Sequence, residues 1–123
     1  MKLNRETATG ILLVSAYDEH SFTINGETHA SSLVLMPDLV EAWSPAIFSE
    51  IRPENFLRVC ELKPALVLIG TGTRQRFPVP ANLRPLIEAR IGFEIMDSGS
   101  ACRTYNLLAS EGRRVAAMLL LES

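Results

Sequence analysis

The stretch "ALVLIGTGTRQRFPVP", residues 65–80, ends a short apolar run in a glycine turn and sets the fold class. An apolar run of this length, bounded by a turn, predicts a buried strand over 65–69. Gly70 and Gly72 follow as in a nucleotide-binding turn, but Gln75 stands where the dinucleotide fingerprint needs a third small residue. The Gly-Lys-Ser/Thr ending of a P-loop is also missing. The stretch therefore predicts a strand and a tight turn with basic side chains, outside both nucleotide motifs.

The chain beyond this turn alternates between helical and extended patterns. Helices are predicted over 82–90 and 100–110, and strands over 91–96 and 113–121. The last strand is almost continuously apolar, as expected for a strand covered on both faces. Together with the strand over 65–69, this is the order of a βαβαβ unit with a parallel core.

Proline and glycine positions define the predicted helices. Pro53 suits the first position of a helix, Pro85 is compatible with a helix only in its first turn, and Gly112 ends the helix over 100–110. In the helix that begins at Pro53, helical spacing places three side chains on one apolar face: Phe56, Leu57 and Cys60. In the helix over 82–90 it places three side chains inward: Leu83, Leu86 and Ile87.

The chain before residue 50 has the pattern of a β-meander. Strands are predicted over 11–18 and 21–24, with a return strand over 27–36 and an extended segment over 38–43. Asn25-Gly26 is a strong hairpin turn, because both residues tolerate positive φ. The sequence thus predicts one mixed α/β domain over residues 1–123, with an antiparallel front portion and a βαβαβ mixed sheet.

Composition restricts the class of function. The chain has 123 residues and a formal net charge of −2, which argues against a general nucleic-acid binder. Cys60 and Cys102 lack paired spacing, and His20 and His29 stand alone, so neither a metal site, a disulfide framework nor a cofactor is expected. The longest apolar run, 115–121, is too short to span a bilayer. We expect a soluble, cytoplasmic protein.

The parallel core predicts where a ligand would bind. The strands over 65–69 and 91–96 end at the same sheet edge, so the loops 70–76 and 97–106 should form a cleft there. The second loop enters a helix N-terminus, which attracts anions, and Arg74 and Arg103 are suited to a carboxylate or phosphate. The candidate binding residues are Gly70, Thr71, Gly72, Arg74, Asp97, Ser98, Gly99, Ser100, Cys102, Arg103 and Asn106.

Several of these residues also have a purely structural interpretation. Ser98 or Ser100 is suited to cap the helix. Arg103 is suited to pair with Asp97 rather than with a ligand. Cys102 in a first helical turn would have a lowered thiol pKa, yet no base is placed to assist it, so a small buried residue is the simpler interpretation. No catalytic residue is assigned.

Two stretches carry a resemblance to a known family. "LVLIGTGTRQRFPVP" and "IGFEIMDSGSACRTYNLLASEGRRVAAMLL" resemble a family of small α/β domains of unknown function, whose mitochondrial member is the respiratory complex I (NADH dehydrogenase) assembly factor 3. Ser98 and Ser100 replace the threonine and alanine of the family pattern. The chain starts without an Arg-rich transit peptide, so it looks like a bacterial member.

The resemblance implies a three-layer mixed fold and a function without an established reaction. The first hypothesis is a non-enzymatic binding or assembly module that acts through a protein partner and does not span the membrane. The second is a protein or enzyme that binds a small anionic molecule in the cleft between 70–76 and 97–106. A small anion that binds alone would distinguish them.

Overall fold

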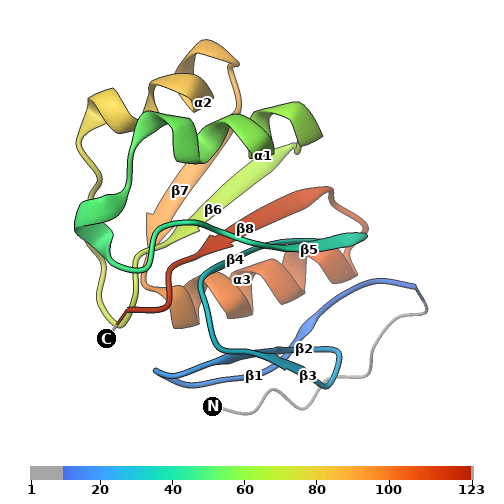
Figure 1. The fold of residues 1–123 in the computed structure, drawn as a ribbon. Helices are drawn as coiled ribbons and strands as arrows, with labels where there is room; N and C mark the ends of the chain where they lie inside the picture. The colour runs from blue at the N-terminus through green and yellow to red at the C-terminus, as the bar shows by residue number, and fades with distance from the viewer. Residues whose placement is uncertain (1–9, 123) are drawn as a thin grey trace.

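The computed structural model describes residues 10–122, which form two β-sheets and short helices (Figure 1). A five-stranded sheet has the order β5-β4-β8-β6-β7, and a three-stranded sheet has the order β1-β2-β3. The short helices α1 and α2 cover one face of the five-stranded sheet, and α3 lies on the other face beside the three-stranded sheet (Figure 1). The mixed α/β class is confirmed.

The front portion begins with an antiparallel meander of β1 (Val14–Tyr17), β2 (Phe22–Ile24) and β3 (Glu27–His29). The predicted turn is confirmed, because Asn25 and Gly26 have φ angles of 47° and 87°. The strands are shorter than the ranges predicted from the sequence.

The predicted return strand over 27–36 is wrong as a single element. It divides at residues 30–32 into β3 and β4 (Leu33–Met36), which belongs to the five-stranded sheet. All four residues of β4 are buried, and such a strand needs a central position covered on both faces. β4 pairs antiparallel with β5 (Leu39–Ala42) and with β8 (Val115–Leu119).

The parallel core of the large sheet agrees with the sequence. β6 (Leu66–Gly70) pairs in parallel with both β7 (Gly92–Met96) and β8. Every residue of β8 is buried, as predicted for a strand with both faces covered. The carboxyl ends of β6, β7 and β8 therefore meet at one edge of the sheet.

The helices on the outer face are shorter and more irregular than expected. Three 3₁₀ segments are present, η1 (Phe48–Glu50), η2 (Pro53–Phe56) and η3 (Pro80–Leu83). η2 leads into α1 (Leu57–Leu62), and η3 leads into α2 (Arg84–Glu88).

Two of the predicted inward residues on these helices are wrong. Leu57 is 55 % exposed and Ile87 is 54 % exposed, whereas Val59 is fully buried. The cause is the 3₁₀ geometry before each α-helix, which has 3.0 residues per turn and changes the face that later residues occupy. Phe56, Leu83 and Leu86 are buried as predicted.

Hydrophobic cores lie on both faces of the five-stranded sheet. One packs the sheet against α3 (Ser98–Ser110) and the three-stranded sheet, and includes Phe22, Leu68 and Tyr105. The other packs it against the outer helices, and includes Trp43 and Phe56, whose rings meet edge to face at a centroid distance of 5.9 Å. Within residues 10–122, no helix has the length and apolar character needed to cross a membrane.

Candidate functional site

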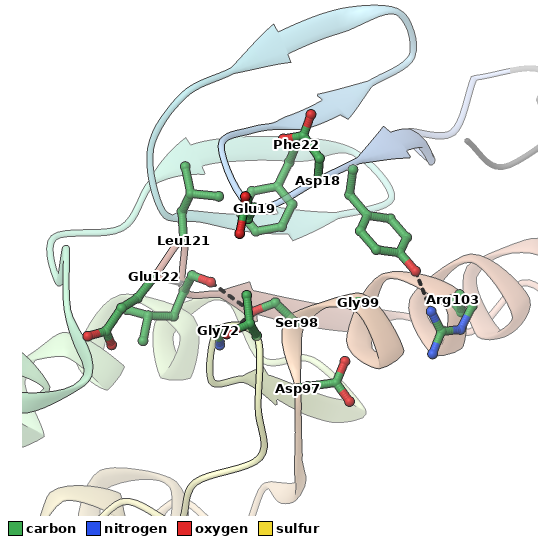
Figure 2. Close-up of a pocket in the computed structure, with 13 residues that line it drawn as sticks. Asp18, Glu19, Phe22, Gly72, Asp97, Ser98, Gly99, Arg103, Leu121 and Glu122 are labelled. Atoms are coloured by element: carbon green, nitrogen blue, oxygen red, sulfur yellow. Dashed lines mark hydrogen bonds between the residues drawn. The ribbon is translucent and has the colours of Figure 1, made fainter. Parts of the chain in front are cut away.

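A cavity of about 240 Å³ lies where the β1–β2 turn, the start of α3 and the end of the chain meet (Figure 2). It opens beside the carboxyl ends of β6, β7 and β8. Its lining consists of Tyr17, Asp18, Glu19, Phe22, Gly72, Thr73, Asp97, Ser98, Gly99, Arg103, Leu120, Leu121 and Glu122.

Ser98 connects the two predicted loops at the back of this cavity. Its backbone N–H donates to the Gly72 carbonyl at 2.8 Å, and its hydroxyl accepts from the Gly72 N–H at 2.9 Å. The same hydroxyl donates to the Leu120 carbonyl at 2.7 Å (Figure 2). A Cβ atom on Gly70 would lie 2.9 Å from the Ser98 Cα atom, so glycine permits this close approach.

Asp97 caps α3, which corrects the expectation that Ser98 or Ser100 does so. The helix begins at Ser98, two residues earlier than predicted, and the Asp97 carboxylate accepts from the Ser100 N–H at 2.8 Å and its hydroxyl at 2.7 Å. Partial burial raises the pKa of Asp97, but these hydrogen bonds and the charge of Arg103 outweigh it and hold the pKa below its usual value.

Three of the N–H groups at the start of α3 are already used within the protein. Those of Ser100 and Ala101 both donate to Asp97, and that of Ser98 donates to Gly72. The positive end of the α3 dipole is therefore neutralised by the protein's own carboxylate.

Arg103 and Tyr17 form one wall of the cavity. The Arg103 guanidinium donates to the Tyr17 hydroxyl (Figure 2). It also donates to the Ser100 hydroxyl at 3.1 Å. The Tyr17 ring lies against Gly99, where a Cβ atom would come within 2.9 Å of the ring. The guanidinium is thus positioned by two hydroxyl groups and by its attraction to Asp97.

Other predicted residues have structural roles outside the lining. Thr71 is fully buried and its hydroxyl donates to the Arg74 carbonyl at 2.8 Å, while the Arg74 side chain is exposed. Asn106 is buried and pairs with both backbone groups of Val14, so it does not join the site. Ser100 supports Asp97 rather than lining the cavity.

Cys102 is a core residue. It is fully buried, and burial raises the pKa of its thiol to about 12. The lowered pKa expected for a first-turn cysteine is therefore wrong, because desolvation outweighs the attraction of the nearby Arg103. The interpretation of Cys102 as a small packed residue agrees with this environment.

The sequence did not identify the hairpin residues or the C-terminal residues of the lining. Parallel pairing of β6 with β8 places the residues after Leu119 at the same edge, and this signal was available in the sequence. Nothing local in the sequence indicates that Tyr17, Asp18, Glu19 and Phe22 fold over the start of α3.

The hairpin side of the cavity is acidic. Four acidic residues, Asp18, Glu19, Asp97 and Glu122, and one arginine, Arg103, belong to the lining. The Asp97 carboxylate caps α3, however, and the Glu122 carboxylate pairs with Arg76, which is not a lining residue. Hydrogen bonds from the backbone, that of His20 first, lower the pKa of Asp18. Asp18 and Glu19 therefore supply negative charge at the hairpin side, which favours a cationic group there. Among the described residues, no cluster of His, Cys, Asp or Glu is suited to hold a metal ion.

The fold is that of a small mixed α/β protein with a cavity at the edge of its sheet. A family of proteins of unknown function, DUF498/DUF598, matches residues 14–120, and the chain belongs to this family. This confirms the resemblance noted in the sequence.

Relatives include mitochondrial and bacterial proteins. The bovine NADH dehydrogenase [ubiquinone] 1 alpha subcomplex assembly factor 3 is 31 % identical over 120 residues, 96 % of this chain and 65 % of that protein. The chain spans 59 % of the corresponding mouse and rat proteins. A Francisella tularensis protein named 13 kDa major membrane protein is 26 % identical. The match covers 98 % of this chain and 99 % of that protein.

Solved structures share the whole fold. A Bordetella parapertussis protein is 34 % identical with a TM-score of 0.84, over 93 % of this chain and 98 % of that chain. A Mth938-like domain from Bordetella pertussis is 28 % identical with a TM-score of 0.84, over 100 % of this chain and 94 % of that chain. The structural likeness covers both sheets and α3.

Proposed function

We propose that this protein is a non-enzymatic binding module that acts through a protein partner in the biogenesis of a membrane complex. The observation that supports it most is the 31 % identity to an assembly factor over 96 % of this chain. Such family analogy is an associational argument, so the site must supply the chemistry. The proposed location is the cytoplasm, since both cysteines are free thiols and suit a reducing compartment.

The cavity is the proposed contact for the partner. Phe22 and Leu121 form an apolar part of its wall. Asp18 and Glu19 provide negative charge at its hairpin side. Such a surface suits a partner segment that presents a lysine or arginine next to apolar side chains. Complementary charges of this kind mainly determine the association rate and the choice of partner.

Charge reversal at the cavity tests this proposal. Glu19 lines the cavity with a side chain that is 57 % exposed, so Glu19→Lys should weaken partner binding without unfolding the protein. Glu27→Lys on β3 is the matched control, because Glu27 is exposed and lies outside the lining. Tagged wild type and both variants are compared by quantitative co-purification from the native host. Equal recovery of every partner with Glu19→Lys would contradict the proposed contact.

The second candidate is a protein or enzyme that binds a small anionic molecule in the same cavity. Its volume of about 240 Å³ and the positioned Arg103 support it. A thermal-shift series with nucleotides, sugar phosphates, coenzyme A and dicarboxylates tests it. A ligand at about a hundred times its dissociation constant stabilises a protein by roughly 2.7 kcal/mol. A shift that Arg103→Ala abolishes would support this candidate over the assembly module.

A further inference from the structure

An apolar surface outside the cavity consists of Ile47, Phe77 and Val79, here called the apolar tip. Their exposed fractions are 43 %, 68 % and 59 %. Pro78 and Pro80 alternate with them and restrict the backbone of the loop. In a water-soluble protein, neighbouring apolar side chains with this exposure indicate an interaction surface.

The parts of the apolar tip lie side by side. A groove of about 260 Å³ is lined by residues of both segments, including Phe48, which follows Ile47 in the chain, and Pro78 and Val79. The loop runs from the end of β6 to η3 beside the layer of α1 and α2, whereas the three-stranded sheet lies at the opposite end of the molecule (Figure 1).

Exposed arginines surround the apolar tip. Arg52 lines the same groove as Val79, and Arg74 and Arg84 are exposed in the segments that flank the loop. Segment 74–90 contains four arginines and one acidic residue, Glu88. The nearest other carboxylates in the sequence are Glu50, which accepts from the Ala46 N–H at 2.8 Å, and Glu54.

Arg76 has a supporting role in this region. Its guanidinium pairs with Glu122 at 2.7 Å and lies over the Phe48 ring at 4.7 Å from the centroid. Glu122 also accepts from the Phe48 N–H at 2.6 Å. η1 is thus fixed against the turn after β6, and Ile47 is held in place by its neighbour.

Charge is distributed unevenly over the whole molecule. Residues 10–51 contain six acidic residues and neither lysine nor arginine. The segments around the apolar tip therefore carry positive charge in a protein whose net charge is −2. Close to a negatively charged surface, such a molecule turns its arginines toward the surface and its three-stranded sheet away from it.

We infer that the apolar tip and Arg52, Arg74 and Arg84 dock this protein peripherally on an anionic lipid membrane. Phe77 and Val79 enter the region between headgroups and acyl chains, while the arginines bind lipid phosphates. The positive charge of these arginines complements an anionic lipid surface, and an exposed side chain such as Phe77 can enter that surface without a matching partner. This inference concerns a surface separate from the cavity and does not depend on the proposed partner.

Vesicle co-sedimentation with the purified protein tests the inference. Vesicles of phosphatidylcholine alone are compared with vesicles in which about one lipid in three is phosphatidylglycerol. We expect binding to the anionic vesicles only, and a decrease as salt rises because screening weakens arginine–lipid attraction. Arg84→Gln should reduce the partition coefficient about fivefold, the effect of one surface arginine. Phe77→Ser should reduce it roughly tenfold, because a buried aromatic ring contributes more than one charge.

Leu107→Ser provides the matched control. Leu107 is 50 % exposed on α3, on the other face of the five-stranded sheet, so its replacement should leave vesicle binding unchanged. Melting temperatures of all variants establish that each is folded. A wild type that fails to bind anionic vesicles would overturn the inference. Equal vesicle binding by Phe77→Ser and wild type would also overturn it. The same holds if a partner protein requires Phe77 for its binding while vesicles do not bind the wild type.

Discussion

Ser98 shows how one hydroxyl group determines the shape of the site. It accepts from Gly72 and donates to Leu120, so it connects the turn after β6, the start of α3 and the segment after β8. The side chain is 6 % exposed, and both of its backbone partners lie within the protein. The wall of the cavity therefore depends on a polar side chain that is almost fully buried.

Ser98→Ala should lower the free energy of unfolding by about 2–4 kcal/mol, because it leaves two buried backbone groups without partners. Urea denaturation measures this change. Ser110→Ala, at the exposed end of α3, should change it by less than about 0.5 kcal/mol. A similarly small effect of Ser98→Ala would refute the role assigned to the hydroxyl.

The Cys102 thiol provides a second residue-scale prediction. Burial raises its pKa to about 12, so a Cys60→Ser variant should not react with a thiol reagent at pH 8 until it is unfolded. The raised pKa also means that this thiol's contribution to stability is complete below about pH 8.5, the unfolded value, and decreases as pH rises toward 12. Fast labelling of the folded variant would show that Cys102 is accessible.

At the scale of elements, α3 positions the three-stranded sheet. Asn106 accepts from the Val14 N–H at 2.9 Å and donates to the Val14 carbonyl at 2.8 Å, completing both backbone hydrogen bonds of that residue. The Tyr105 hydroxyl donates to the Leu12 carbonyl at 2.8 Å. The hairpin that covers the cavity is thus held by side chains of the same helix whose first turn lines it.

Asn106→Ala should release the three-stranded sheet first. Hydrogen exchange should show lower protection in β1 and β2 than in β6 and β8, because the removed side chain serves Val14 alone. An equal loss of protection in β6 and β8 would indicate that the two sheets open together and that Asn106 has no local role.

The same elements show how far the sequence determines the structure. Local patterns predicted the hairpin turn, the parallel strands and the edge where the cavity lies, since each depends on neighbouring residues. The faces of α1 and α2 were mispredicted because 3₁₀ turns precede them. The contact of Tyr17 with Gly99 is a long-range packing event, and the sequence has no periodic signal for it. The four hairpin residues among the thirteen of the lining were therefore beyond local analysis.

At the scale of the molecule, a hydrophobic core lies on each face of the five-stranded sheet, and side chains from the strands of that sheet belong to both cores. We propose that residues 10–122 unfold as one unit. Trp43, the only tryptophan of the chain, reports on the outer core, and far-UV circular dichroism reports on all elements. The two transitions should coincide in urea. Separate midpoints would show that the three-stranded sheet and α3 unfold independently of the outer core.

The most direct test of the assembly-factor proposal is the amount of assembled NADH dehydrogenase in membranes of the native host. Native gels and membrane NADH oxidation are compared after removal of the gene and after its return as wild type, Glu19→Lys or Glu27→Lys. We expect that removal lowers the amount of assembled complex, and that wild type and Glu27→Lys restore it while Glu19→Lys does not. An unchanged amount of complex after removal of the gene would contradict the proposed function.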